Sequence, residues 1–157
     1  AAMGWYPHAA EQGHPEAQLR LGYFSVVGHS IPRDIEAAVD WFTQAARNGE
    51  AAAQAWLGAM YANGRGVTKN EEEAVLWFRR AAEQGSAEAQ CALGIMYFIG
   101  KGVTQDFVEA YIWLRLAAEQ DVVPAGYTRA ATAARNLTNE QLRDARLQIN
   151  NRRETRD

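Results

Sequence analysis

Residues 86–121 read SAEAQCALGIMYFIGKGVTQDFVEAYIWLRLAAEQD, and residues 50–85, directly before them, read EAAAQAWLGAMYANGRGVTKNEEEAVLWFRRAAEQG. The two segments are identical at 19 of 36 positions without a gap. Four tryptophans keep the same interval of 36 residues along the chain: Trp5, Trp41, Trp77 and Trp113. Self-similarity at this period is typical of proteins built from stacked structural repeats.

The first part of each repeat predicts a helix that ends at a glycine turn. Between residues 51 and 63, Ala53, Leu57 and Met60 are apolar and follow one another at helical spacing, which predicts one buried stripe. Gly64 and Gly66 come next, and two glycines this close stop a helix and permit the positive φ angles of a tight turn.

The second part of each repeat predicts another helix, packed on the first. Asn70 occupies the position of Asp34 and Asp106 in the other copies, where a side-chain oxygen can cap a helix N-terminus. The repeat is therefore a helical hairpin, in which small residues such as Gly58 let the helices approach closely. The phased tryptophans are expected in the core, in preference to a stacking platform for bases or sugars.

The repeats divide the 157 residues into one all-α solenoid of antiparallel helix pairs. We expect a partial repeat with only the second helix (1–13), three full repeats (14–49, 50–85 and 86–121) and capping helices (122–157). Thr138 and Gln141 have the spacing of a capping box for the last helix. The sequence also allows self-association through the solenoid ends, because the unpaired first helix offers a stacking face and the last repeat exposes Ile112 and Leu116 unless the capping helices cover them.

The segment from Ala87 to Gln120, with its sister copies, resembles the Sel-1-like repeat (SLR) family, a relative of the tetratricopeptide repeats. The resemblance implies a right-handed superhelix and a role as an adaptor in bacterial envelope, secretion or signalling complexes. A cysteine-rich branch of the family is associated with penicillin binding or weak β-lactam hydrolysis. This chain has a single cysteine, Cys91, so neither the disulfides nor that activity carry over.

The composition argues against several other classes of protein. The net charge of −3 does not favour nucleic acid, and the longest apolar run, ten residues from Cys91 to Gly100, is too short to span a bilayer. His8, His14 and His29 fall in different predicted elements, which predicts neither a metal site nor a cofactor. Arginines and carboxylates alternate after Arg143, which predicts a solvated helix face.

Function is expected at positions that do not repeat, because the repeated ones form the core. In solenoids of this kind the first helix of each repeat lines the concave surface. There the side chains predicted to bind a protein or peptide partner are Arg20, Tyr23, Val27, Trp56, Asn63, Ile95 and Ile99. The alternative is that Trp56 and Ile95 pack against each other or a neighbouring helix.

The leading prediction is therefore a non-catalytic adaptor rather than an enzyme. The rival is a binder or weak hydrolase of cell-wall or β-lactam-like ligands. No secretory signal is visible, which a mature or trimmed form would also explain. The compartment stays open between the bacterial periplasm, the extracellular space and the cytoplasm.

Overall fold

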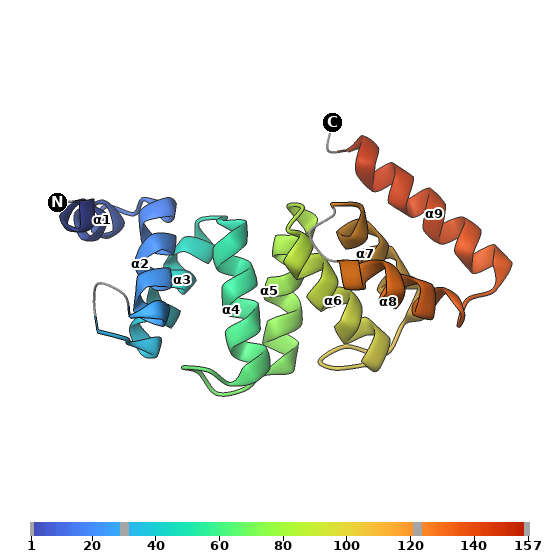
Figure 1. Cartoon of the computed structure of the whole chain (residues 1–157), viewed down its shortest axis with the longest axis horizontal. Helices are drawn as coiled ribbons and strands as arrows, with labels where there is room; N and C mark the ends of the chain where they lie inside the picture. Colours follow the sequence, from blue (N-terminus) through green and yellow to red (C-terminus); the bar gives the residue numbers. More distant parts are fainter. Residues whose placement is uncertain (1, 29–31, 121–123, 156–157) are drawn as a thin grey trace. The chain divides into compact units, whose positions relative to one another are not determined.

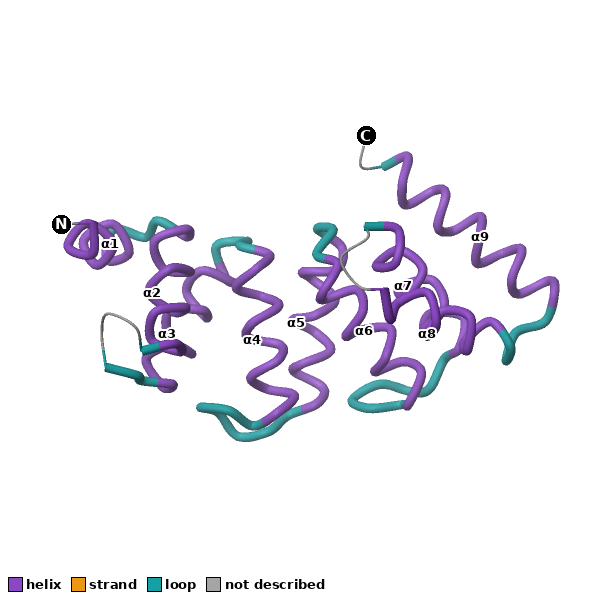
Figure 2. Tube along the Cα trace, viewed as in Figure 1, coloured by secondary structure: helices purple, strands orange, loops and turns teal. Residues whose placement is uncertain are grey.

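The computed structural model describes residues 2–28, 32–120 and 124–155, without the side chains of residues 2, 3 and 124–127. Over these residues the chain consists of helices and loops and contains no strand (Figure 2). The helices, in chain order (Figure 1), are α1 (Ala2–Glu11), α2 (Pro15–Val27), α3 (Ile35–Arg47), α4 (Ala51–Asn63), α5 (Glu71–Glu83), α6 (Ala87–Ile99), α7 (Phe107–Glu119), α8 (Pro124–Ala134) and α9 (Asn139–Glu154). The predicted all-α fold is confirmed.

The chain divides into two compact units, Ala1–Gln84 and Gly85–Asp157. In the first unit α2 packs against α3 and α4 against α5, while α1 packs against α2 and α3 against α4. In the second unit α7 packs against α6, α8 and α9. Each repeat is thus a helical pair, as its sequence predicts. Among the described residues, no helix combines the length and the apolar character that crossing a bilayer requires.

Side-chain caps fix where the second helix of each repeat begins. The Asn70 Oδ1 accepts a hydrogen bond from the backbone N–H of Glu73 (3.1 Å), and Asp34 and Asp106 cap α3 and α7 in the same way. Thr138 and Gln141 form the complete capping box predicted for α9. These bonds satisfy N–H groups that have no partner inside the helix, so the predicted caps are confirmed.

The glycine turns also follow the prediction. Gly64 ends α4 in the left-handed region with φ at 64°, and Gly66 has φ at 74°. Val67 then packs against the apolar cluster of the first unit. The turn therefore combines two backbone conformations that only glycine adopts readily with one apolar side chain that holds it to the core.

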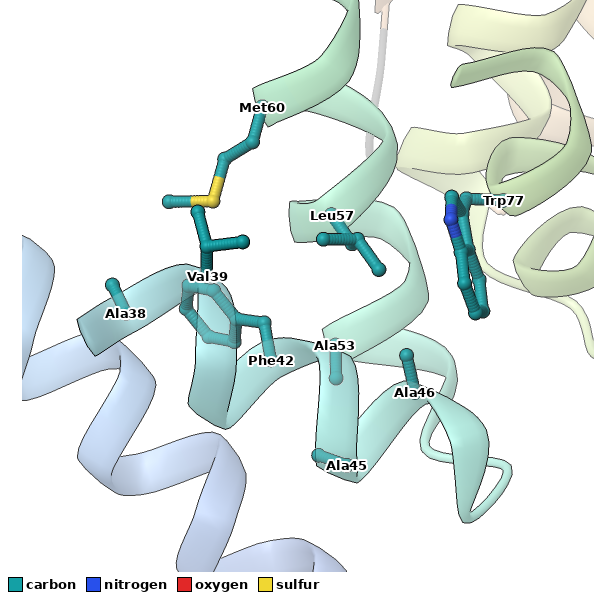
Figure 3. Packing of buried hydrophobic residues seen from close by; sticks show 9 residues of the cluster. All are labelled: Ala38, Val39, Phe42, Ala45, Ala46, Ala53, Leu57, Met60 and Trp77. Atoms are coloured by element: carbon teal, nitrogen blue, oxygen red, sulfur yellow. The ribbon is translucent and has the colours of Figure 1, made fainter. Parts of the chain in front are cut away.

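One apolar cluster forms the centre of the first unit (Figure 3). Its buried members come from α3, α4 and α5 and are Ala38, Val39, Phe42, Ala45, Ala46, Ala53, Leu57, Met60 and Trp77. A Cβ added to Gly58, on α4, would lie 2.8 Å from the ring of Phe78 on α5. Glycine is thus needed at this position for the two helices to approach closely, as predicted.

The repeated glutamines are buried and link neighbouring helices. They are Gln18, Gln54 and Gln90. The Gln54 amide nitrogen donates to the carbonyl of Ala46 in α3 (3.1 Å), while its side-chain oxygen accepts from Gln84 at the end of α5 (2.8 Å). Gln18 and Gln90 accept equivalent bonds from Asn48 and Gln120. Each glutamine therefore holds the C-terminal end of the second helix of its own repeat.

The tryptophans do not share one environment. Trp113 is 1% exposed and Trp77 9%, as predicted for core residues, and Trp41 is partly buried against the apolar cluster of α1 and α2. Trp5 is 64% exposed, so the prediction that it lies in the core is wrong. In the first unit Trp41 and Trp77 pack on helices that precede their own, whereas no described helix precedes α1.

The closing helices cover the apolar face of α7. Ile112 and Leu116 are both buried, because α8 and α9 pack against α7. The Arg152 guanidinium lies 4.6 Å from the centre of the Trp113 ring, and Arg153 forms an ion pair with Glu119. The apolar face of Ile112 and Leu116 is consequently not available for self-association.

Candidate functional site

The non-repeating face of α2 is exposed in the first unit. Arg20, Tyr23 and Val27 are spaced by three and four residues and therefore project from the same side of the helix. Tyr23 is 46% exposed and Val27 48%, which is high for apolar or aromatic side chains. No other element of the first unit covers these two side chains fully, so another molecule can contact them.

A cavity of about 370 Å³ brings together three of the predicted binding residues. It lies on α2 and α4 and is lined by Arg20, Tyr23 and Trp56 together with Glu16, Leu19, Glu50 and Ala52. We call this site the aromatic pocket. Its wall combines two aromatic rings, one guanidinium and two carboxylates.

Ring contacts hold Trp56 in place within the aromatic pocket. The indole stacks on Phe42 of α3 with ring centres 5.5 Å apart and planes 4° apart, and Tyr23 meets it edge-on at 6.4 Å. Trp56 is partly buried as a result. Trp56 therefore packs against a neighbouring helix through Phe42, as the alternative prediction states, and it also lines the cavity.

The charged side chains of the aromatic pocket are only loosely paired. Arg20 Nη2 lies 3.9 Å from Glu16 Oε1, and both side chains are mostly exposed. An exposed ion pair of this kind contributes about 0–1 kcal/mol. Little energy therefore opposes the exchange of this contact for one with a charged group on a partner.

Val27 and Asn63 do not line the aromatic pocket. Asn63, at the end of α4, donates from its side-chain nitrogen to the carbonyl of Ala59 (2.8 Å), within its own helix. Val27 lies at the end of α2. The structure leaves both exposed but does not bring them to the cavity.

In the second unit Ile95 and Ile99 line a smaller cavity of about 220 Å³. The other lining residues are Phe98, Leu114, Arg129 and Thr132, from α6, α7 and α8. We call this site the apolar pocket. Cys91 is buried, and its Sγ lies 3.7 Å from Arg129 Nη1.

The sequence did not predict the residues of the aromatic and apolar pockets that lie away from the non-repeating positions of α2, α4 and α6. Arg129 and Thr132 lie on α8, where the repeat pattern ends, so no phase indicated their neighbours. Glu50 occupies the position before α4, which is a helix-cap position in every repeat. Ser86 occupies the same position before α6, so the repeat pattern alone gives Glu50 no binding role.

The histidines lie apart within the described residues. His8 pairs with Gln12 on α1, His14 precedes α2, and His29 lies outside the described residues. In the described part of the chain no three His, Cys, Asp or Glu side chains are grouped as metal ligands would be.

Comparison with protein-family models gives matches to the Sel1 repeat at residues 15–50, 51–86 and 87–122. These three segments each contain one pair of helices, α2 with α3, α4 with α5, and α6 with α7. Comparison with curated proteins gives no significant match.

Two solved bacterial structures are similar to this chain. One is a protective antigen of uropathogenic Escherichia coli that displays an SLR fold, with 38% identity and a TM-score of 0.87 over 98% of this chain. The chain spans only 32% of the length of that protein. The other is a Sel1 repeat protein from Oxalobacter formigenes, with 35% identity and a TM-score of 0.77 over 83% of this chain and 98% of that one.

Proposed function

The chain belongs to the Sel1 repeat family, and we propose that it is a non-catalytic adaptor that binds a protein or peptide through the exposed faces of α2, α4 and α6. Sel1 repeat proteins are generally scaffolds for protein interactions. The observation that carries the proposal is that Arg20, Tyr23 and Trp56, all at non-repeating helix positions, line one cavity, where Arg20 and Tyr23 are exposed and Trp56 is partly buried.

The chemistry of the aromatic pocket supports a protein ligand. Tyrosine, tryptophan and arginine are the side chains that most often dominate the energy of protein interfaces. Trp56 is already fixed by its stacking on Phe42, so binding would cost little conformational entropy at this ring. A pre-ordered aromatic wall with an adjacent guanidinium suits a partner side chain that is apolar and carries a polar end.

The apolar pocket supports a second contact of the same kind. Ile99 is 49% exposed and lies beside Ile95 in a cavity of mainly apolar lining. We propose that it accepts an apolar side chain of the partner, and that Val27 and Asn63 contribute to the rim of the binding surface. The setting we propose is a bacterial envelope, secretion or signalling complex, in keeping with the bacterial source of both structural relatives.

Capture by variants tests this proposal. The wild-type chain, Tyr23→Ala and Leu76→Ala are immobilised, and proteins retained from a bacterial lysate are quantified by mass spectrometry. Leu76 on α5 is the matched control, because it is 53% exposed but lies outside both pockets. Loss of an interface tyrosine should lower the yield of a specific partner about tenfold, whereas Leu76→Ala should retain it.

Two results would contradict the proposal. Equal yields from Tyr23→Ala and Leu76→Ala would show that the aromatic pocket makes no contribution. The second result combines two observations: Trp56→Ala unfolds at a much lower temperature than the wild type, and Tyr23→Ala, which stays folded, still captures the partner. Together they would show that both aromatic rings serve packing alone.

A further inference from the structure

A third cavity, of about 600 Å³, lies within the second unit on α7, α8 and α9. It belongs to neither pocket described above. Arg115 and Glu119 of α7 line one side, and Arg146 and Arg153 of α9 line another. The alternating charges of the last helix predict only a solvated face, yet two of its arginines line this cavity.

The side chains of this cavity carry an excess of positive charge. Three arginines line it, against Glu119 as the single carboxylate, which leaves a formal charge of +2. Arg153 is committed to the protein, because its Nε lies 3.0 Å from Glu119 and its Nη1 donates to Asn150. Arg115 Nε also lies 3.6 Å from Glu119.

Arg146 is the available cation of the cavity. Its guanidinium has no ion pair or hydrogen bond with the described residues, and its side chain is exposed. A guanidinium presents donors in a fork that matches the oxygens of a carboxylate or a phosphate. An anion entering the cavity would therefore find, in Arg146, donors that no described residue uses.

Tyr111 provides a second unused donor. This residue of α7 lines the cavity and is only 8% exposed, but its hydroxyl has no hydrogen-bond partner among the described residues. No described side-chain oxygen or nitrogen is both sealed from solvent and unpaired, so the hydroxyl is accessible. Ala130 and Ile149, both buried, add apolar lining beside it.

We propose that this cavity binds an organic anion, with its carboxylate or phosphate group on Arg146 and Tyr111 and its apolar body against Ala130 and Ile149. Charge complementarity selects the anion, and the apolar lining selects against a bare inorganic ion. The site lies on different residues from the proposed protein-binding pockets, so the two proposals stand or fall separately.

Titration of the full chain with two probes tests the site. Phenyl phosphate and benzoate share an apolar ring and differ in the anionic group, and phenol supplies the same ring without the charge. Backbone amide chemical shifts along α9 should respond saturably to at least one anion and not to phenol. The stronger of the two anions identifies the preferred group, and either one supports the proposal.

Two variants of the same helix make the test specific. Arg146→Gln should weaken binding about tenfold or more, because it removes a charge-assisted hydrogen bond. Arg143→Gln removes the same charge from an exposed position of α9 outside the cavity and should leave the affinity within about twofold of the wild type, since screened surface charges interact weakly. Tyr111→Phe should reduce affinity without any change of charge.

Three results would overturn the proposal. They are equal losses in Arg146→Gln and Arg143→Gln, an equal response to phenol, and the absence of any saturable shift. Thermal unfolding of each variant shows whether it is folded. Because Arg146 is exposed, its substitution should leave the protein folded, so weaker binding by Arg146→Gln would not result from unfolding.

Discussion

At the scale of single residues, the glycine in the middle of the first helix of each repeat determines how closely that helix packs against the second helix of the repeat. Gly58→Ala is the sharpest test, because the new Cβ would lie 2.8 Å from the Phe78 ring, which is itself buried. Overpacking of this kind costs about 1–3 kcal/mol of the free energy of unfolding. We expect urea denaturation to show a loss in this range.

Gly4→Ala is the matched control for that substitution. Gly4 also lies within a helix, α1, but apart from its chain neighbours and the backbone of its own helix no described atom lies within 4 Å of the position its Cβ would take. Replacing an exposed helical glycine by alanine should raise stability by up to about 1 kcal/mol through helix propensity. If both substitutions change stability by the same amount and in the same direction, close packing is not the reason for glycine at position 58.

Residue identity alone did not predict every environment. The phase of the tryptophans correctly predicted burial of Trp77 and Trp113, but Trp5 is exposed because burial depends on the helix that packs on the ring. The phase of Gln54 was visible in the sequence, whereas its role was not. A hydrogen bond to a carbonyl eight residues earlier in the chain requires the fold before it can be identified.

At the scale of helices, the caps determine where each second helix begins. Asn70→Ala removes the acceptor of the Glu73 N–H and should destabilise the chain by about 1 kcal/mol, since capping side chains contribute this much. Asn70→Asp should keep the stability near that of the wild type. Thermal or urea unfolding monitored by circular dichroism measures both.

Thr68→Ala is the control for the cap. Thr68 lies in the same loop and is exposed, and the side chain that caps α5 is that of Asn70. Its substitution should change stability by less than about 0.5 kcal/mol, as is usual for surface positions. If Asn70→Ala is as stable as Thr68→Ala, the Asn70 cap does not contribute to the free energy of unfolding.

Helix boundaries were predictable wherever local signals existed. Gly64, Asn70 and the pair Thr138 and Gln141 each act through neighbours a few residues away, so the sequence carries the information directly. The region of α8 lacks the repeat pattern. The contact of Arg129 with α6 depends on tertiary packing and had no sequence signal.

At the scale of the whole molecule, the repeated positions build the core and the non-repeating positions carry exposed chemistry. Helical spacing predicted that Arg20 and Tyr23 share one face of α2, and the interval of 36 residues predicted that Trp56, the equivalent of Arg20, lies on the same face of α4. The sequence did not predict that Val27 and Asn63 lie outside the aromatic pocket, nor the cavity around Arg146. Cavities form between helices, and their lining depends on side-chain packing that spacing does not determine.

Photo-crosslinking tests most directly whether the exposed, non-repeating positions bind a partner while the repeated positions form the core. Benzoyl-phenylalanine is introduced separately at positions 23 and 99, on the proposed binding faces, and at position 76, an exposed site of α5. The account predicts that one and the same partner is crosslinked from positions 23 and 99 and not from position 76. Crosslinking of that partner from position 76 alone, or equally from all three positions, would contradict it.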